Sequence, residues 1–353
     1  MNESLLRDLT QADGIPSRED NVREIVASVM QPLVDEMRVD ALGNLIGIKK
    51  GKGGPRVALA AHMDEIGFIV RYIDDKGFLR IQPVGGFDPR VLVAQRVRVH
   101  CRDGKYLSGV LQPGTKPIHL LQPGESKDLK IEDLFIDLGM SVDAVKEHVS
   151  IGDMVTMRRD FERVGDMVVT KALDDRLGVY TMLEALRAAG DTDAEIIAIA
   201  TVQEEVGLRG ATTAAFGVQP DIAIALDTTI AADTPGIPDD AAVTRLGQGA
   251  AIKVFDSSQL PNRKVIEHLR DIAEANDIPH QLEVLPRGGT DAGAFQRAQD
   301  GVITCTISLP SRYVHTVNEM AAVSDIEAAV ELLAQFLREA GTREYGYSIP
   351  GDQ

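Results

Sequence analysis

The sequence predicts an α/β fold into which a β-rich segment is inserted. Continuous apolar runs at 56–61 and 196–200 are typical of strands in a sheet that is covered on both faces. Amphipathic segments at about 262–276 and 324–340 predict helices that cover such a sheet. Between about 68 and 160, short β-like runs dominate instead, so a separate β module interrupts the α/β pattern.

The N-terminal part predicts helix, then a turn, then strand. Residues 5–36 have a helical pattern, with Ser17-Arg18-Glu19-Asp20 as a candidate N-terminal cap. Gly43-Asn44 is typical of a turn that leads into a strand beginning at Leu45. The apolar strand at 56–61 follows.

Short strands joined by hairpin turns are predicted in the β module. Asp75-Lys76-Gly77 and Asp103-Gly104-Lys105 are typical of such turns, and one helix is predicted from Ser141 to Val149. The predicted strands lie at 68–73, 78–81, 97–100 and 106–111. We interpret the histidines of the module as structural or surface residues: His100, His119 and His148.

The α/β pattern returns after the module and continues to the closing helix. The glycine-rich turn at 287–293 enters a helix, and it either presents backbone donors to a substrate or allows tight packing. The other predicted elements are strands at 167–170, 196–200, 221–226 and 302–308, and helices through Tyr180 and Ala189, at about 262–276 and at about 324–340.

Composition and net charge limit the classes of protein to which this chain can belong. Of the 353 residues, 44% are hydrophobic and 26% charged, which is typical of a globular protein with one large domain or two ordinary ones. A formal net charge of −17 argues against a nucleic-acid partner, because such proteins usually present a basic surface. Cys101 and Cys305 are too few for a disulfide framework or a thiolate zinc site. We expect a cytoplasmic protein without a membrane partner, since neither a signal peptide nor a membrane-spanning apolar run is visible.

The carboxylate pair Glu204-Glu205 follows the buried strand at 196–200. Two carboxylates at the end of a buried strand are costly unless something compensates them. One can bind a metal ion while the other acts as a general acid/base. The alternative interpretation is that both are solvated loop residues.

Two other pairs of polar residues lie where a predicted strand ends or a predicted helix begins. His62 and Asp64 follow the strand at 56–61 and share a face if the strand continues. A histidine ligand commonly donates its second ring N–H to a carboxylate, although a hydrogen-bonded histidine at a strand end is the alternative. Asp174-Asp175 comes just before a helix, where Asp is also a favoured N-cap.

Histidines and carboxylates at or just past strand ends, or at turns into helices, form a candidate metal-ligand set: His62, Asp174, Glu205, Asp227 and His315. Ligands collect at this edge of open α/β sheets. Two imidazoles and three carboxylates suit divalent zinc, cobalt or manganese. Five ligands are too many for one tetrahedral zinc with an open position, but they fit two ions if one carboxylate bridges them.

The order of these residues resembles the M42 family of co-catalytic metallo-aminopeptidases, which includes glutamyl and tetrahedral aminopeptidases. The resemblance covers essentially the whole chain and rests on Ala61-His62-Met63-Asp64-Glu65-Ile66-Gly67, Ala172-Leu173-Asp174-Asp175-Arg176, Gln203-Glu204-Glu205-Val206-Gly207, Leu226-Asp227, Gly289-Thr290-Asp291-Ala292-Gly293 and Arg312-Tyr313-Val314-His315. It implies a mixed-sheet sandwich of the di-zinc exopeptidase type at 1–67 and 163–353. A small barrel-like dimerisation domain would be inserted at 68–162.

The resemblance also implies a role for each site residue. Two divalent ions would be bound per subunit, zinc first, with cobalt or manganese as alternatives, and a cis peptide would join Asp174 to Asp175. Peptides with a free N-terminus would be the substrates. The implied roles are Asp174 as the bridging ligand, Glu205 and His315 completing one metal site, His62 and Asp227 completing the other, Glu204 as general base/acid, and Asp64 as the partner of His62.

The sequence also leads to expectations about the oligomer that the protein forms and about alternative functions. The resemblance implies self-association into dimers and a tetrahedral twelve-subunit particle. A di-metal amidohydrolase or carboxypeptidase is the nearest rival. A metal-free binding protein would not need the complete ligand set. An endoglucanase, a label that some family members carry, usually has aromatic stacking surfaces, whereas this chain has 4% aromatic residues and no Trp. The N-terminal residue that the enzyme prefers in its substrate stays open. Three cations either lie near the pocket and favour acidic side chains or are paired on the surface: Lys171, Arg287 and Arg312.

Overall fold

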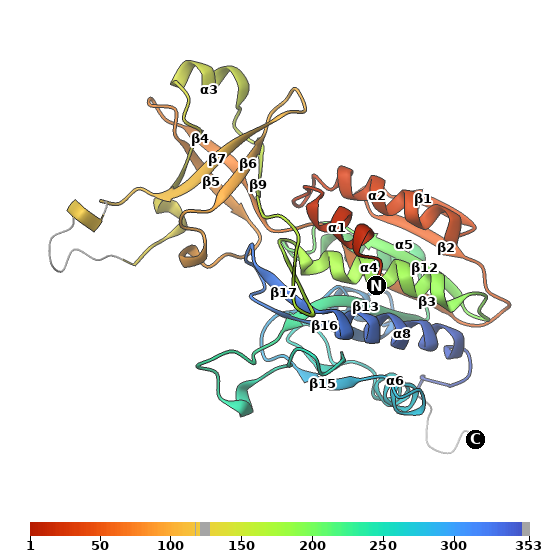
Figure 1. Cartoon of the computed structure of the whole chain (residues 1–353). Helices are drawn as coiled ribbons and strands as arrows, with labels where there is room; N and C mark the ends of the chain where they lie inside the picture. Colours follow the sequence, from red (N-terminus) through yellow and green to blue (C-terminus); the bar gives the residue numbers. More distant parts are fainter. Residues whose placement is uncertain (117, 121–127, 348–353) are drawn as a thin grey trace.

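A computed structural model describes residues 1–116, 118–120 and 128–347 and contains a large mixed sheet and a smaller closed barrel (Figure 1). Within these residues the large sheet has 11 strands, nine of them in the order β1-β2-β12-β3-β13-β16-β17-β11-β10, while β14 pairs with β15 and β16. The strands are β1 (Glu36–Val39), β2 (Leu45–Lys49), β3 (Arg56–His62), β10 (Glu162–Val164), β11 (Met167–Thr170), β12 (Glu195–Thr201), β13 (Ile222–Ile230), β14 (Ala250–Phe255), β15 (His280–Val284), β16 (Ile303–Arg312) and β17 (Glu319–Ala322). The predicted α/β class is therefore confirmed.

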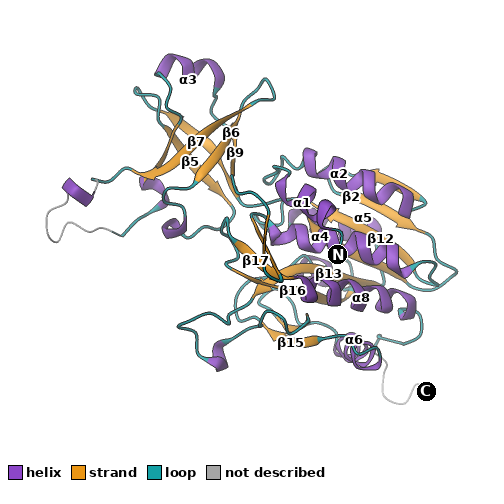
Figure 2. Ribbon diagram, viewed as in Figure 1, coloured by secondary structure: helices purple, strands orange, loops and turns teal. Residues whose placement is uncertain are grey.

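The large sheet is the middle layer of a sandwich, with helices on both faces (Figure 2). Along β3, Val57 and Leu59 belong to one core cluster and Ala58 to the other, as strand alternation requires. Each fully buried large aliphatic side chain contributes about 1.5–3 kcal/mol, so both layers stabilise the sheet. The first cluster is covered by α1 (Glu3–Gln11), α2 (Asp20–Met30), α4 (Leu173–Ala189), α6 (Arg263–Ala275) and α8 (Val323–Glu339), and the second by α5 (Arg209–Val218) and α7 (Ala292–Gln296).

Parallel pairing in the middle of the sheet brings several strand ends to one edge. Strand β3 lies between β12 and β13 and is parallel to both. His62, the last residue of β3, is opposite Thr201, the last residue of β12. The segments that follow these strands therefore begin side by side.

The barrel is built from the chain between Gly67 and Met157 and stands to one side of the large sheet (Figure 1). Its strands run in the order β4-β5-β8-β7-β6-β9, and Val317, just before β17, packs into its core. The bounds are β4 (Gly67–Ile73), β5 (Leu79–Val84), β6 (Arg96–His100), β7 (Tyr106–Pro113), β8 (Leu134–Asp137), β9 (Met154–Met157) and α3 (Val142–His148). The predicted domain boundaries at 67 and 163 and the role of the barrel in dimerisation stay predictions.

The N-terminal segment differs from the continuous helix expected at 5–36. Ser17 has a φ of 72° and lies in a turn between α1 and α2, so the helix is broken there. Residues 36–39 form β1 because they pair with β2. Glu19 is the N-cap of α2, and its side chain makes no capping hydrogen bond. Among the described helices, none is both long enough and apolar enough to cross a membrane.

Candidate metal centre

The predicted ligand residues converge at the edge where β3, β12 and β13 end. His62 is the last residue of β3, while Glu204 and Glu205 lie in the loop after β12. Asp174 lies at the start of α4, and His315 lies between β16 and β17. Asp227 is inside β13 rather than past its end, because pairing with β16 extends that strand to Ile230.

Two overlapping groups of ligand atoms are present. Atoms of His62, Asp174 and Asp227 lie within 4.8 Å of one another, as do atoms of Asp174, Glu205 and His315. Asp174 belongs to both groups: its Oδ1 is 3.3 Å from His62 Nε2, and its Oδ2 is 3.4 Å from His315 Nε2. The donor types and their spacing therefore fit two divalent cations that share one carboxylate.

The backbone around Asp174 is irregular. The Asp174–Asp175 peptide bond is cis, as the resemblance implied, and neither residue has helical φ and ψ angles. The buried carboxylate of Asp175 accepts hydrogen bonds from the backbone N–H of His62 (3.2 Å) and of Gly178 (2.9 Å). Asp175 therefore joins the start of α4 to the end of β3.

The imidazole of His62 is oriented by its own strand end. Its Nδ1 lies 3.0 Å from the backbone oxygen of Asp64 and 3.6 Å from the carboxylate Oδ1 of that residue. A carbonyl oxygen only accepts, so Nδ1 donates and Nε2 is left facing Asp174. The expected partnership of Asp64 with His62 stays a prediction, since the closer contact is with the backbone.

The carboxylate of Asp64 holds the loop that carries the glutamate pair. Fully buried Asp64 accepts hydrogen bonds from the backbone N–H of Glu204 (3.0 Å, Oδ1) and of Glu205 (3.1 Å, Oδ2). Glu19 accepts another from the backbone N–H of Gln203 (3.2 Å). Both glutamate side chains are therefore presented from a fixed backbone.

Negative charge is concentrated in this site. Burial raises the pKa of Glu204 well above its ordinary value; His62 opposes this shift and Asp227 adds to it. The pKa of Asp227 is raised well above its ordinary value by burial and by Asp174. Burial opposes the ionisation of Asp174 too, but His315 and His62 hold its pKa below the usual range. Divalent cations would relieve the mutual repulsion of these carboxylates.

Two supporting carboxylates were not predicted from the sequence. Buried Glu319, in β17, accepts hydrogen bonds from the backbone N–H of Asp174 (3.0 Å) and of His315 (2.8 Å). Buried Asp291 accepts one from the hydroxyl of Thr201 (2.5 Å). Asp291 could have been found, because it lies in the glycine-rich turn, whereas no local pattern marks Glu319.

A cavity of about 520 Å³ opens beside the ligand groups. The end of β13, with Thr229 and Ile230, forms part of its wall, together with Leu285 and Tyr313. Buried Lys253 also lines it, and its Nζ lies 2.8 Å from Glu283 Oε1.

The three cations that the sequence left open have different surroundings. Exposed Arg287 lines the cavity. Arg312 pairs with Asp233 at 2.6 Å, and Lys171 is buried against Glu65.

A sandwich of this type, with His and carboxylate groups overlapping at the ends of parallel strands, defines a candidate dinuclear metallohydrolase. The sequence model of the family described as M42 glutamyl aminopeptidase matches residues 43–332. The chain belongs to this family and is a peptidase of the aminopeptidase class.

Similar proteins cover nearly the whole chain. An aminopeptidase structure from the archaeon Desulfurococcus kamchatkensis is 41% identical, with a TM-score of 0.92 over 96% of this chain and 94% of that one. A lysyl aminopeptidase of Pyrococcus furiosus is 35% identical, covering 95% of this chain and 96% of the relative. A TET1 peptidase structure of Pyrococcus horikoshii, described as assembling into a tetrahedron or a large octahedral shell, is 35% identical, with a TM-score of 0.85 over 96% and 99%.

Proposed function

We propose that the protein removes N-terminal amino acids from peptides at a site that holds two divalent ions. The observation that supports this most directly is the sharing of Asp174 between the two ligand groups beside Glu204. In the proposal His62 and Asp227 complete one group, and Glu205 and His315 complete the other. Bound there, the ions would lower the pKa of a water molecule and polarise the scissile carbonyl.

Glu204 is the proposed general base and acid. Its Oε2 lies 4.0 Å from His62 Nε2, so the carboxylate reaches the ligand groups, and it also lines the cavity. It takes the proton from the attacking water and returns it to the leaving amine. Asp64 supports this role by holding the backbone N–H of Glu204.

The proposed substrate is a peptide with a free α-amino group. Membership of an aminopeptidase family supports this choice over the amidohydrolase reading. The cavity beside the ligand groups has room for a side chain of the N-terminal residue. Its few aromatic lining residues give no support to an endoglucanase.

Zinc is the first choice of ion, with cobalt or manganese as alternatives, because histidine and carboxylate ligands suit all of them. For the assembly we propose dimers that build a tetrahedral dodecamer. The tetrahedral form described for the TET1 peptidase supports this proposal.

The test is hydrolysis of aminoacyl-anilides with free or acetylated N-termini, before and after chelation and with zinc, cobalt or manganese restored. Cleavage of only the free-amine substrates, lost on chelation and regained with metal, is the expected result. Cleavage of only acetylated substrates would favour the amidohydrolase, and activity that survives complete chelation would exclude the metal mechanism.

A further inference from the structure

A group of charged side chains, here called the sheet–barrel charge cluster, lies where the large sheet meets the barrel. It consists of Asp13, Glu65, Arg98, Lys171 and Arg176. Lys171, Glu65 and Arg176 are almost fully buried, and the side chains of Asp13 and Arg98 are 10% and 18% exposed. Charges buried in this way are tolerated only when each has a partner.

The contacts of the cluster form one continuous path. Arg98 Nη1 donates to Asp13 Oδ2 at 2.8 Å, and Lys171 Nζ lies 3.4 Å from Asp13 Oδ1. Lys171 Nζ also donates to both carboxylate oxygens of Glu65, at 2.7 and 2.8 Å. Asp13 therefore joins Arg98 to the Lys171–Glu65 pair.

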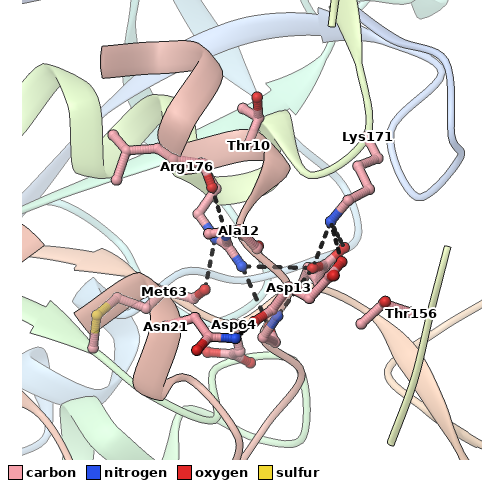
Figure 3. Close-up of polar contacts among 12 residues, drawn as sticks. Thr10, Ala12, Asp13, Asn21, Met63, Asp64, Thr156, Lys171 and Arg176 are labelled. Atoms are coloured by element: carbon pink, nitrogen blue, oxygen red, sulfur yellow. Dashed lines mark hydrogen bonds and ion pairs between the residues drawn. The ribbon is translucent and has the colours of Figure 1, made fainter. Parts of the chain in front are cut away.

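Arg176 fixes the backbone next to this path. It donates from Nε to the backbone oxygen of Met63 (2.7 Å) and from Nη1 to that of Ala12 (2.9 Å). Figure 3 shows Asp13 between Lys171 and Arg176, with Met63 beside Arg176 and Thr156 of the barrel at the margin of the cluster. The C-terminal end of α1 and the end of β3 are thereby held together.

The cluster lies next to the proposed ligands in sequence. Glu65 directly follows Asp64, and Lys171 lies shortly before Asp174. The Lys171–Glu65 pair therefore ties the segment that carries His62 to the segment that carries Asp174. A change in this pair alters the spacing of ligands that must be held within a few tenths of an ångström.

Arg98 is the member of the cluster that comes from the barrel. It lies in β6, and its guanidinium also stands 5.1 Å from the ring centroid of Tyr106. Without Arg98, Asp13 would keep Lys171 as its closest cation and compete with Glu65 for it. The barrel strand β6 therefore contacts Asp13 mainly through the Arg98 guanidinium at 2.8 Å, with the ring of His100 farther away at 3.7 Å.

We propose that Arg98 is a positioning residue for the metal centre. Through Asp13 it keeps Lys171 on Glu65, and so holds the His62 and Asp174 segments at the spacing that retains the ions. This inference rests on the proposed metal site, although Arg98 touches none of the proposed ligands.

The experiment measures the rate at which the zinc-loaded protein releases zinc to a chromogenic chelator, together with its melting temperature. Arg98→Met and Asp13→Asn are expected to release zinc about tenfold faster or more, the usual range for residues that support metal ligands. Arg98→Lys, which keeps the charge, is expected to fall between Arg98→Met and the unmodified protein. Arg96→Met is the matched control, because Arg96 is an exposed residue of the same strand.

These measurements distinguish failure of the Arg98 proposal from failure of the proposed metal site. If folded Arg98→Met and Asp13→Asn lose thermal stability but release zinc at the rate of the Arg96→Met control, the cluster is only structural and the inference is wrong. If Arg98→Met does not fold, the result for Asp13→Asn decides. If the unmodified protein binds no zinc, cobalt or manganese, the proposed function itself fails.

Discussion

The carboxylate of Asp64 accepts a hydrogen bond from the backbone N–H of Glu204 at 3.0 Å. This contact joins the end of β3 to the loop after β12, so the proposed base and the strand that carries His62 share one support. Because Asp64 is fully buried, water does not replace the contact when it is lost.

Replacement of Glu204 by Gln is expected to leave both ions bound and to reduce kcat by about 10²–10⁴-fold, the usual contribution of general acid/base groups. The amide keeps the shape of the side chain but does not accept the proton. Turnover and metal content measured on the same samples check this. Near-normal turnover with full metal content would remove Glu204 from the role of base.

Replacement of Asp64 by Asn is expected to lower both kcat and the free energy of unfolding, the latter by about 1–3 kcal/mol. The new NH₂ group would face the backbone N–H of either Glu204 or Glu205, and that N–H would lose its hydrogen-bond acceptor. Denaturant unfolding and steady-state kinetics test this, with Asp75→Asn at an exposed turn as the control. If the two variants behave alike, Asp64 does not hold the loop.

Glu19 predicts a pH dependence of stability. Burial, followed by the charge of Asp64, raises its pKa to about 7, against hydrogen bonds from the backbone of Ser17 and Gln203. The folded state thus holds the proton more tightly than the unfolded chain. The contribution of this group to the free energy of unfolding is therefore lost as the pH rises from about 4.5 to about 7.

Glu19→Gln is expected to remove this contribution to the pH dependence, which amounts to roughly 3–4 kcal/mol over the whole range at about 1.4 kcal/mol per pKa unit. Urea unfolding of the two metal-loaded proteins at about pH 5 and about pH 8 measures the difference. Parallel losses of stability in both proteins would show that Glu19 does not carry a raised pKa.

Arg287 lines the cavity and makes no ion pair within the described part of the chain. Arg287→Met is expected to lower kcat/KM for glutamyl-anilide relative to leucyl-anilide by about 1.4-fold to fivefold, corresponding to the roughly 0.2–1 kcal/mol of an exposed charge pair. Arg297→Met, at an exposed position that does not line the cavity, is the control. An unchanged ratio would place the side chain of the substrate away from Arg287.

Much of the site could be predicted because its chemistry follows the strand pattern. The apolar strands before His62 and Glu204 are parallel neighbours, and parallel strands bring their carboxyl ends to one edge. Sequence order then gave a candidate ligand set, and the fold brings its members within reach of one another.

Other features depend on contacts that no local pattern encodes. Glu319, in β17, accepts a hydrogen bond from the backbone N–H of Asp174. The carboxylate of Asp64 lies 3.0 Å from the backbone nitrogen of Glu204 but 3.6 Å from Nδ1 of His62. Residues 36–39 form β1 by antiparallel pairing with β2. Glu36, the last residue of the expected helix, is therefore the first residue of a strand.

Titration of metal-free protein with zinc, while hydrolysis of leucyl-anilide with a free N-terminus is followed, measures how many ions the active site needs. We expect activity to rise until two ions are bound per chain and then to level off, because Asp174 belongs to both ligand groups. Full activity with a single ion per chain, or activity that does not depend on zinc, cobalt or manganese, would contradict the two-ion account.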